Sequence, residues 1–169
     1  MIVILPYIVT GVIILISLVI QSHSSFDAIR IFGVKPDLVF IIVVYSGYSF
    51  GPITGQVTGF ISGLFHDAVS NSPYGFLAFP KLTVGFIVGL IGRSVLKNNV
   101  PTIIILMLVA TLVKGIITLI LSYIFAQGMI SAIIDVIIPE SLYNCILAPP
   151  LFFLLDKIFR RELEREGYL

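Results

Sequence analysis

The sequence predicts an all-α integral membrane protein that crosses the bilayer six times. Of its 169 residues, 58% are hydrophobic and 11% are charged, whereas an ordinary soluble domain carries about 25% charged residues. A chain of this length in water would lack the polar side chains needed to cover its surface. The few charges also stand apart, which leaves uncharged apolar stretches near the roughly 20 residues that a membrane helix needs.

Six helices follow from the positions of the charges, prolines and turn residues. We expect them over residues 2–21, 36–50, 52–69, 76–94, 101–126 and 136–156. The uncharged stretch 38–65 is too long for one crossing, and Gly51 followed by Pro52 divides it, because proline suits the first turn of a helix and glycine the turn before it. A cleaved signal peptide is the alternative for the first helix, but a basic start is missing and the apolar stretch is too long.

Residues 1–169 form a single transmembrane domain in this prediction, and residues 157–169 form a charged helical tail. Arg160 and Glu164 have the i,i+4 spacing of a helical ion pair. Residues 22–35 predict a short helix lying at the membrane interface. The positive-inside rule places both termini in the cytoplasm, because six basic residues fall on that side and only Arg30 and Lys35 on the other. The six are Arg93, Lys97, Lys157, Arg160, Arg161 and Arg165.

Glycines recur every four residues on the third predicted helix and again on the fourth. Each of these helices therefore has one face of small residues. In lipid, such faces bring helices together because their backbones can approach closely. The face can pack the protein's own bundle or receive the helix of a partner. The glycines in question are Gly51, Gly55, Gly59, Gly63, Gly85 and Gly89.

Five ionisable residues lie in the predicted helices or at their outer ends, where burial in lipid is costly and usually means pairing inside the bundle. Asp67 extends the glycine row of the third helix by four residues, and Lys81 precedes Gly85 by four. We expect Lys81 to be the counter-ion of Asp37 or Asp67, and the pairing of Lys114 with Glu140 stays open. A charge-paired structural network or a substrate or ion pathway would use Asp37, Asp67, Lys81, Lys114 and Glu140.

Several classes of chemistry are absent from the sequence. A net charge of +1 does not fit a nucleic-acid binder, which needs a basic face. Cys145 is the only cysteine, so neither a disulfide nor a thiol metal site is expected. His66 and Asp67 adjoin, but neighbouring helical positions differ by about 100° and cannot easily serve one site. We therefore predict no enzyme, no cofactor and no metal ion.

The order and spacing of several motifs resemble the MreD family of rod shape-determining membrane proteins, over essentially the whole chain. The specific part of this resemblance is residues 36–89. One departure lies between the second and third helices, where family members often carry basic residues and this chain has residues 49–52 without any. The matching motifs are Pro36-Asp37-Leu38-Val39, Gly51-Pro52-x-x-Gly55, Gly59-Phe60-x-x-Gly63-Leu64-x-x-Asp67, Tyr74-Gly75, Gly85-Phe86 and Asn144-x-x-Leu147-Ala148-Pro149-Pro150.

The resemblance implies a six-helix protein of the bacterial inner membrane that binds MreC, a single-pass membrane protein. It also implies membership of the elongation machinery, which couples the actin-like MreB to peptidoglycan synthesis. A second copy of this chain is a further candidate partner beside the lipid bilayer. The family is similar in architecture to the substrate-binding S-components of ECF-type transporters. The alternative function is therefore a small-molecule-binding transporter component, with an outer cavity lined by Asp37, Asp67, Lys81 and Glu140.

Overall fold

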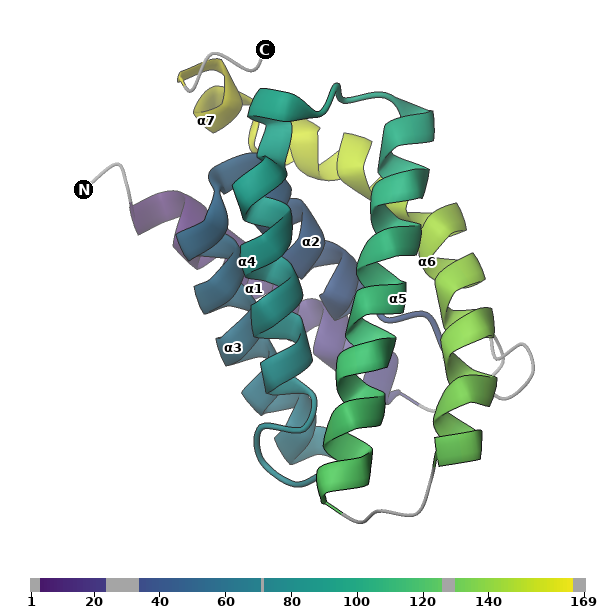
Figure 1. Ribbon diagram of the computed structural model, residues 1–169. Coiled ribbons are helices and arrows are strands. Elements are labelled where there is room, and N and C mark those ends of the chain that lie inside the picture. Colours follow the sequence, from purple (N-terminus) through teal and green to yellow (C-terminus); the bar gives the residue numbers. More distant parts are fainter. Residues whose placement is uncertain (1–3, 24–33, 71, 126–129, 166–169) are drawn as a thin grey trace.

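The computed structural model describes residues 4–23, 34–70, 72–125 and 130–165. These residues form helices and no strand, which confirms the all-α prediction (Figure 1). The predicted interface helix falls mostly in residues 24–33 and lies outside the described residues, as do the last four residues of the tail. The helices are α1 (Ile4–Ser22), α2 (Leu38–Phe50), α3 (Pro52–Ser70), α4 (Ala78–Val95), α5 (Val100–Ile124), α6 (Ile130–Ile158) and α7 (Arg160–Arg165).

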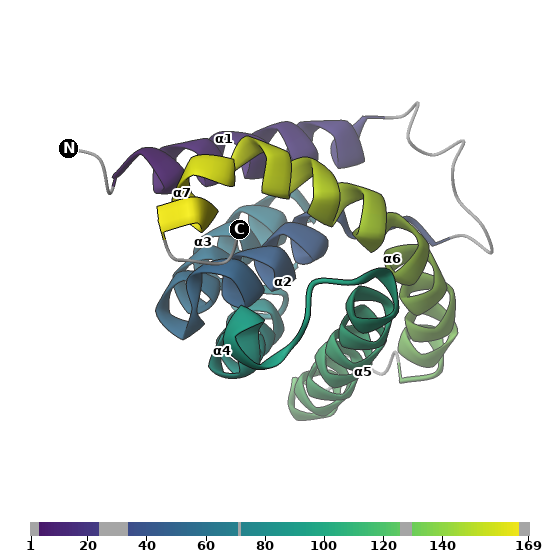
Figure 2. The same cartoon turned by 90° about the horizontal axis from the view of Figure 1, so that it is seen from above.

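α2 is the central helix of the bundle. Every residue from Val39 to Ser49 is buried, as expected for a helix that is hydrophobic all round. Seen from above, α2 lies between α1 and α6 on one side and α4 on the other (Figure 2). Its 13 residues give a length of about 20 Å, so α2 is shorter than the roughly 30 Å hydrocarbon core of a bilayer.

Two helix boundaries form as the sequence predicts. Gly51 has a φ of 88° and separates α2 from α3, and its backbone N–H donates to the Gly47 carbonyl at 2.9 Å. Pro52 is the first residue of α3. α5 follows Asn99, whose side chain accepts a hydrogen bond from the Thr102 N–H at 3.0 Å and so caps the helix.

α6 and α4 differ from the prediction. α6 begins before residue 136, earlier than expected. It passes through Pro139, Pro149 and Pro150, which were expected to be kinks or ends of this helix, and its ribbon changes direction along its length (Figures 1 and 2). Membrane helices tolerate such prolines because neighbouring groups satisfy the freed backbone carbonyls. α4 contains a break at Gly92, with a φ of 51°. Nothing in the sequence spacing signals that break.

Among the described residues, two stretches are long and apolar enough to cross a membrane, α5 and residues Asp135–Ile158 of α6. Residues Ile8–Ser22 of α1 and all of α2 form shorter apolar helices. α3 and α4 are less apolar than α5, because glycine, threonine and serine occupy part of their surfaces. The six crossings therefore stay a prediction.

The two ends of the bundle differ in charge. α7 and the α4–α5 connection lie at one end, and the α3–α4 connection lies at the other (Figure 1). We call the first the basic end. It carries Arg93, Lys97, Lys157, Arg160, Arg161 and Arg165.

Candidate functional site

Asp37 is the centre of a buried ionic cluster at the end opposite the basic end. It is the N-cap of α2, and its Oδ1 accepts a hydrogen bond from the Phe40 N–H at 2.9 Å. Its Oδ2 also lies 3.1 Å from Lys81 Nζ of α4 and 2.9 Å from Lys114 Nζ of α5. One carboxylate thus caps a helix and joins three helices.

Lys114 connects this cluster to α6 by a second ion pair, with Glu140. Asn144, one turn further along α6, accepts a hydrogen bond from the Asp37 backbone N–H and donates one to Thr111, both at 3.3 Å. The cluster therefore holds two carboxylates and two ammonium groups. Such a balance offsets the cost of burial, because each charge in a low-dielectric interior needs an opposite partner.

His66 belongs to the same cluster, which the sequence reasoning missed. Its Nδ1 lies 2.6 Å from Lys81 Nζ. An ammonium group can only donate, so Nδ1 of His66 is the acceptor and carries no proton. The sequence did hold a signal, because the row Thr54, Thr58 and Ser62 reaches His66 in one more step of four.

Asp67 lies apart from this cluster, although we expected it to belong to the same polar network as Asp37. Its side chain is completely buried. Its carboxylate accepts hydrogen bonds from the backbone N–H groups of Gly75 and Leu77, both at 2.8 Å, and of Ala78 at 3.3 Å. Asp67 thus holds the α3–α4 connection at the start of α4, and of the two expected partners of Lys81 it is Asp37 that forms the ion pair.

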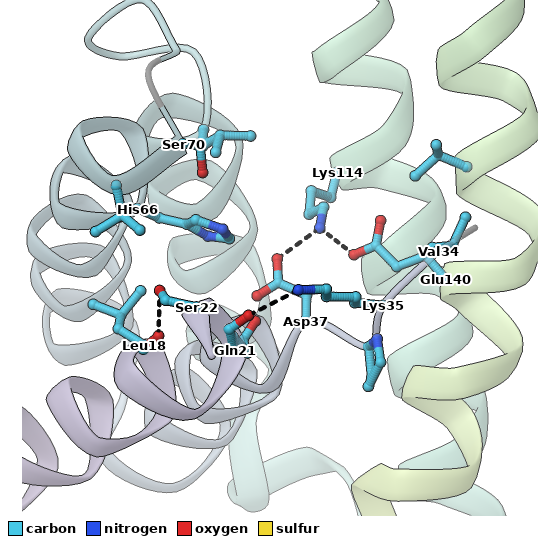
Figure 3. A pocket seen from close by; sticks show the side chains of 14 residues that line it. Leu18, Gln21, Ser22, Val34, Lys35, Asp37, His66, Ser70, Lys114 and Glu140 are labelled. Carbon is cyan, nitrogen blue, oxygen red and sulfur yellow. Dashed lines mark hydrogen bonds and ion pairs between the residues drawn. The ribbon is translucent and has the colours of Figure 1, made fainter. Parts of the chain in front are cut away.

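A cavity of 580 Å³ lies beside the ionic cluster, between the ends of α1 and α3, the start of α2, and α5 and α6. Figure 3 shows Asp37, Lys114 and Glu140 together on its wall, with His66 on the other side. Asp37 and Glu140 were expected to line an outer cavity. Lys81 and Asp67, which were also expected there, are not among the lining residues.

The glycine faces of α3 and α4 pack against each other. A Cβ on Gly59 would lie 2.5 Å from the Lys81 carbonyl oxygen, and one on Gly63 would overlap the Ala78 backbone. Gly55 and Gly85 face each other, and Gly89 lies against Pro52. Gly51 has open space and serves the turn. The glycine row is thus covered by the protein's own helices.

A second buried polar cluster, also missed from the sequence, lies towards the basic end around Asp156 of α6. Its carboxylate pairs with Arg93 of α4 and accepts hydrogen bonds from Tyr45 at 2.9 Å and Asn98 at 2.7 Å. Arg93 also donates to Ser49 at 3.1 Å. No spacing rule could find this cluster, because its members come from three distant parts of the chain, residues 45–49, 93–98 and 156.

These arrangements fit a rigid bundle better than a reactive centre. Both clusters satisfy their charges internally. Within the described ranges, no group of three or more histidine, cysteine, aspartate or glutamate side chains is placed to hold a metal ion. The cavity beside the Asp37 cluster and the apolar outer surface are candidates for recognition.

Comparison with known proteins supplies the family. The family model described as rod shape-determining protein MreD matches residues 1–162. No curated protein and no solved structure matches the chain. The match covers almost the whole chain and agrees with the motifs between Pro36 and Gly89. The chain belongs to the MreD family of rod shape-determining membrane proteins.

Proposed function

We propose that this protein is a non-enzymatic scaffold that binds an MreC-like single-pass membrane protein. The family membership, which implies a role in rod shape determination, is the observation that carries the proposal. The wider role is to help couple MreB to peptidoglycan synthesis within the elongation machinery of the bacterial inner membrane.

The docking surface in this proposal is the outward side of α3 and α4. A partner helix was expected beside the glycine faces. Because α4 covers the glycine row of α3, the partner would bind the surface of the two helices that remains exposed. Large apolar side chains project from the remaining surface of this pair, where a membrane helix can pack by shape. They include Ile53, Val57, Phe60, Ile61, Phe86, Leu90 and Ile91.

Co-purification tests this surface. The tagged chain and its MreC-like partner are extracted together in mild detergent, and the retained partner is measured for Phe60→Ala/Ile61→Ala. The control is Ile105→Ala/Ile116→Ala on α5, whose side chains are at least as exposed. We expect at least about a 10-fold loss for the α3 pair, because a few central contacts carry most binding energy. Unchanged retention, or equal loss in the control, would contradict the docking surface.

One observation favours the alternative function, a small-molecule-binding component similar to an ECF S-component. The 580 Å³ cavity beside Asp37, Lys114 and Glu140 lies within the usual size of ligand pockets. Mass spectrometry of small molecules released from the purified protein tests it, together with thermal unfolding in the presence of each released compound. A compound that stabilises the protein by binding the native state would favour this function. If no released compound stabilises the protein, the scaffold function is favoured.

A further inference from the structure

A second cavity, of 410 Å³, lies at the basic end between α1 and the junction of α6 and α7. Val9 of α1 forms one wall. The continuous segment from Lys157 to Glu162 forms the other. In the view of Figure 2, α1 overlaps the last part of α6, and the cavity lies where Val9 comes near the α6–α7 junction. The cavity therefore lies between one segment near the N-terminus and one near the C-terminus of the chain.

The charge of this cavity is predominantly positive. Lys157, Arg160 and Arg161 line it, with Glu162 as the one carboxylate among the lining residues. Arg160 is engaged by Glu164 at 2.8 Å in an exposed pair. In the part of the chain that the structure describes, the charged groups of Lys157 and Arg161 make no hydrogen bond or ion pair. Two cations at the cavity wall are thus available to an anion.

The apolar lining shows what kind of anion fits. Val9, Ile158 and Phe159 line the cavity beside the cations, and the apolar surface continues along α1 through the exposed Ile8 and Val12. The cavity also lies where the apolar stretch Asp135–Ile158 ends. Lipid headgroups lie at this depth if the stretch crosses the bilayer. A small soluble anion would leave that apolar wall unused.

We propose that this cavity binds the phosphate group of an anionic phospholipid, with Lys157 and Arg161 as its cationic partners and an acyl chain lying along α1. Ammonium and guanidinium groups both form charge-assisted hydrogen bonds to phosphate oxygens. Basic pockets between membrane helices at the cytoplasmic face bind anionic headgroups in this way. The proposal is independent of the scaffold function.

Native mass spectrometry of the full chain in a neutral detergent tests the site. The protein is titrated with dioleoyl phosphatidylglycerol and, separately, with dioleoyl phosphatidylcholine. We expect phosphatidylglycerol to bind at least about 10-fold more tightly, since each nearby basic residue adds about a factor of five to the attraction of an anionic lipid. Lys157→Gln/Arg161→Gln should lose most of this preference. Val9→Phe, which fills the cavity without changing its charge, should weaken binding as well.

Lys97→Gln/Arg165→Gln is the matched control, because it removes the same charge from the same end but from residues that do not line the cavity. Melting in phosphatidylcholine verifies that each variant is folded. Equal losses in the control and in Lys157→Gln/Arg161→Gln would overturn the proposal, since they indicate diffuse attraction to the basic end. Unchanged phosphatidylglycerol binding in Lys157→Gln/Arg161→Gln and in Val9→Phe would also overturn the proposal. The same holds if an equal concentration of inorganic phosphate displaces the lipid.

Discussion

Lys114 lies between two carboxylates that come from different helices, Asp37 and Glu140. The sequence placed all three within membrane helices or at their ends and predicted that such charges pair. It could not decide whether Lys114 reaches Glu140, because their expected depths differ. The structure resolves this through Asp37, which brings α2 against both α5 and α6.

Replacing Lys114 with methionine should destabilise the protein by about 3 kcal/mol or more, because buried Glu140 would lose its ion pair and Asp37 would keep only Lys81. Lys114→Met/Glu140→Gln should recover much of this loss, since Asp37 and Lys81 remain as a balanced pair. Thermal unfolding in detergent measures both variants, with Lys97→Met as the exposed control. If Lys114→Met proved as stable as Lys97→Met, the ion pairs of Lys114 would contribute little to stability.

At the scale of the helix, the glycine row was the strongest sequence pattern, and its period of four located the face that packs. Which helix covers the face could not be read from the sequence, because any small-residue face can accept another. The Gly92 break was also not predictable, and the three prolines of α6 indicated kinks or ends but not which of the two. Their geometry depends on neighbouring helices, which satisfy the freed backbone groups.

Gly59→Ala should destabilise the packing of α3 on α4, because the new Cβ would lie 2.5 Å from the Lys81 carbonyl oxygen and overpacking costs about 1–3 kcal/mol. Gly11→Ala on α1 is the matched control, since a Cβ there has nothing within 4 Å. Both changes improve helix propensity equally. Unfolding in detergent should therefore show a loss for Gly59→Ala and none for Gly11→Ala. Equal stability of the two would mean that the α3–α4 contact is not tight.

At the scale of the whole molecule, the distribution of charge predicts the orientation. The positive-inside rule places the basic end in the cytoplasm and the Asp37 cluster towards the outer side. Single cysteines at Lys97, Arg161 and Tyr74, introduced after Cys145→Ser, test this with a membrane-impermeant thiol reagent on intact inner-membrane vesicles of known orientation. We expect positions 97 and 161 to react from the cytoplasmic side and position 74 from the other. Labelling of positions 74 and 97 from the same side would contradict the topology.

The proposed function depends on the docking of an MreC-like membrane helix on the outward surface of α3 and α4. Photo-cross-linking in living cells tests it most directly, with the photoreactive residue at Phe60 or Leu90 and, as controls, at Ile105 or Ile146, all four being exposed. We expect cross-links to the partner from positions 60 and 90 and none from 105 and 146. Cross-links of equal yield at all four positions, or none at 60 and 90, would contradict it.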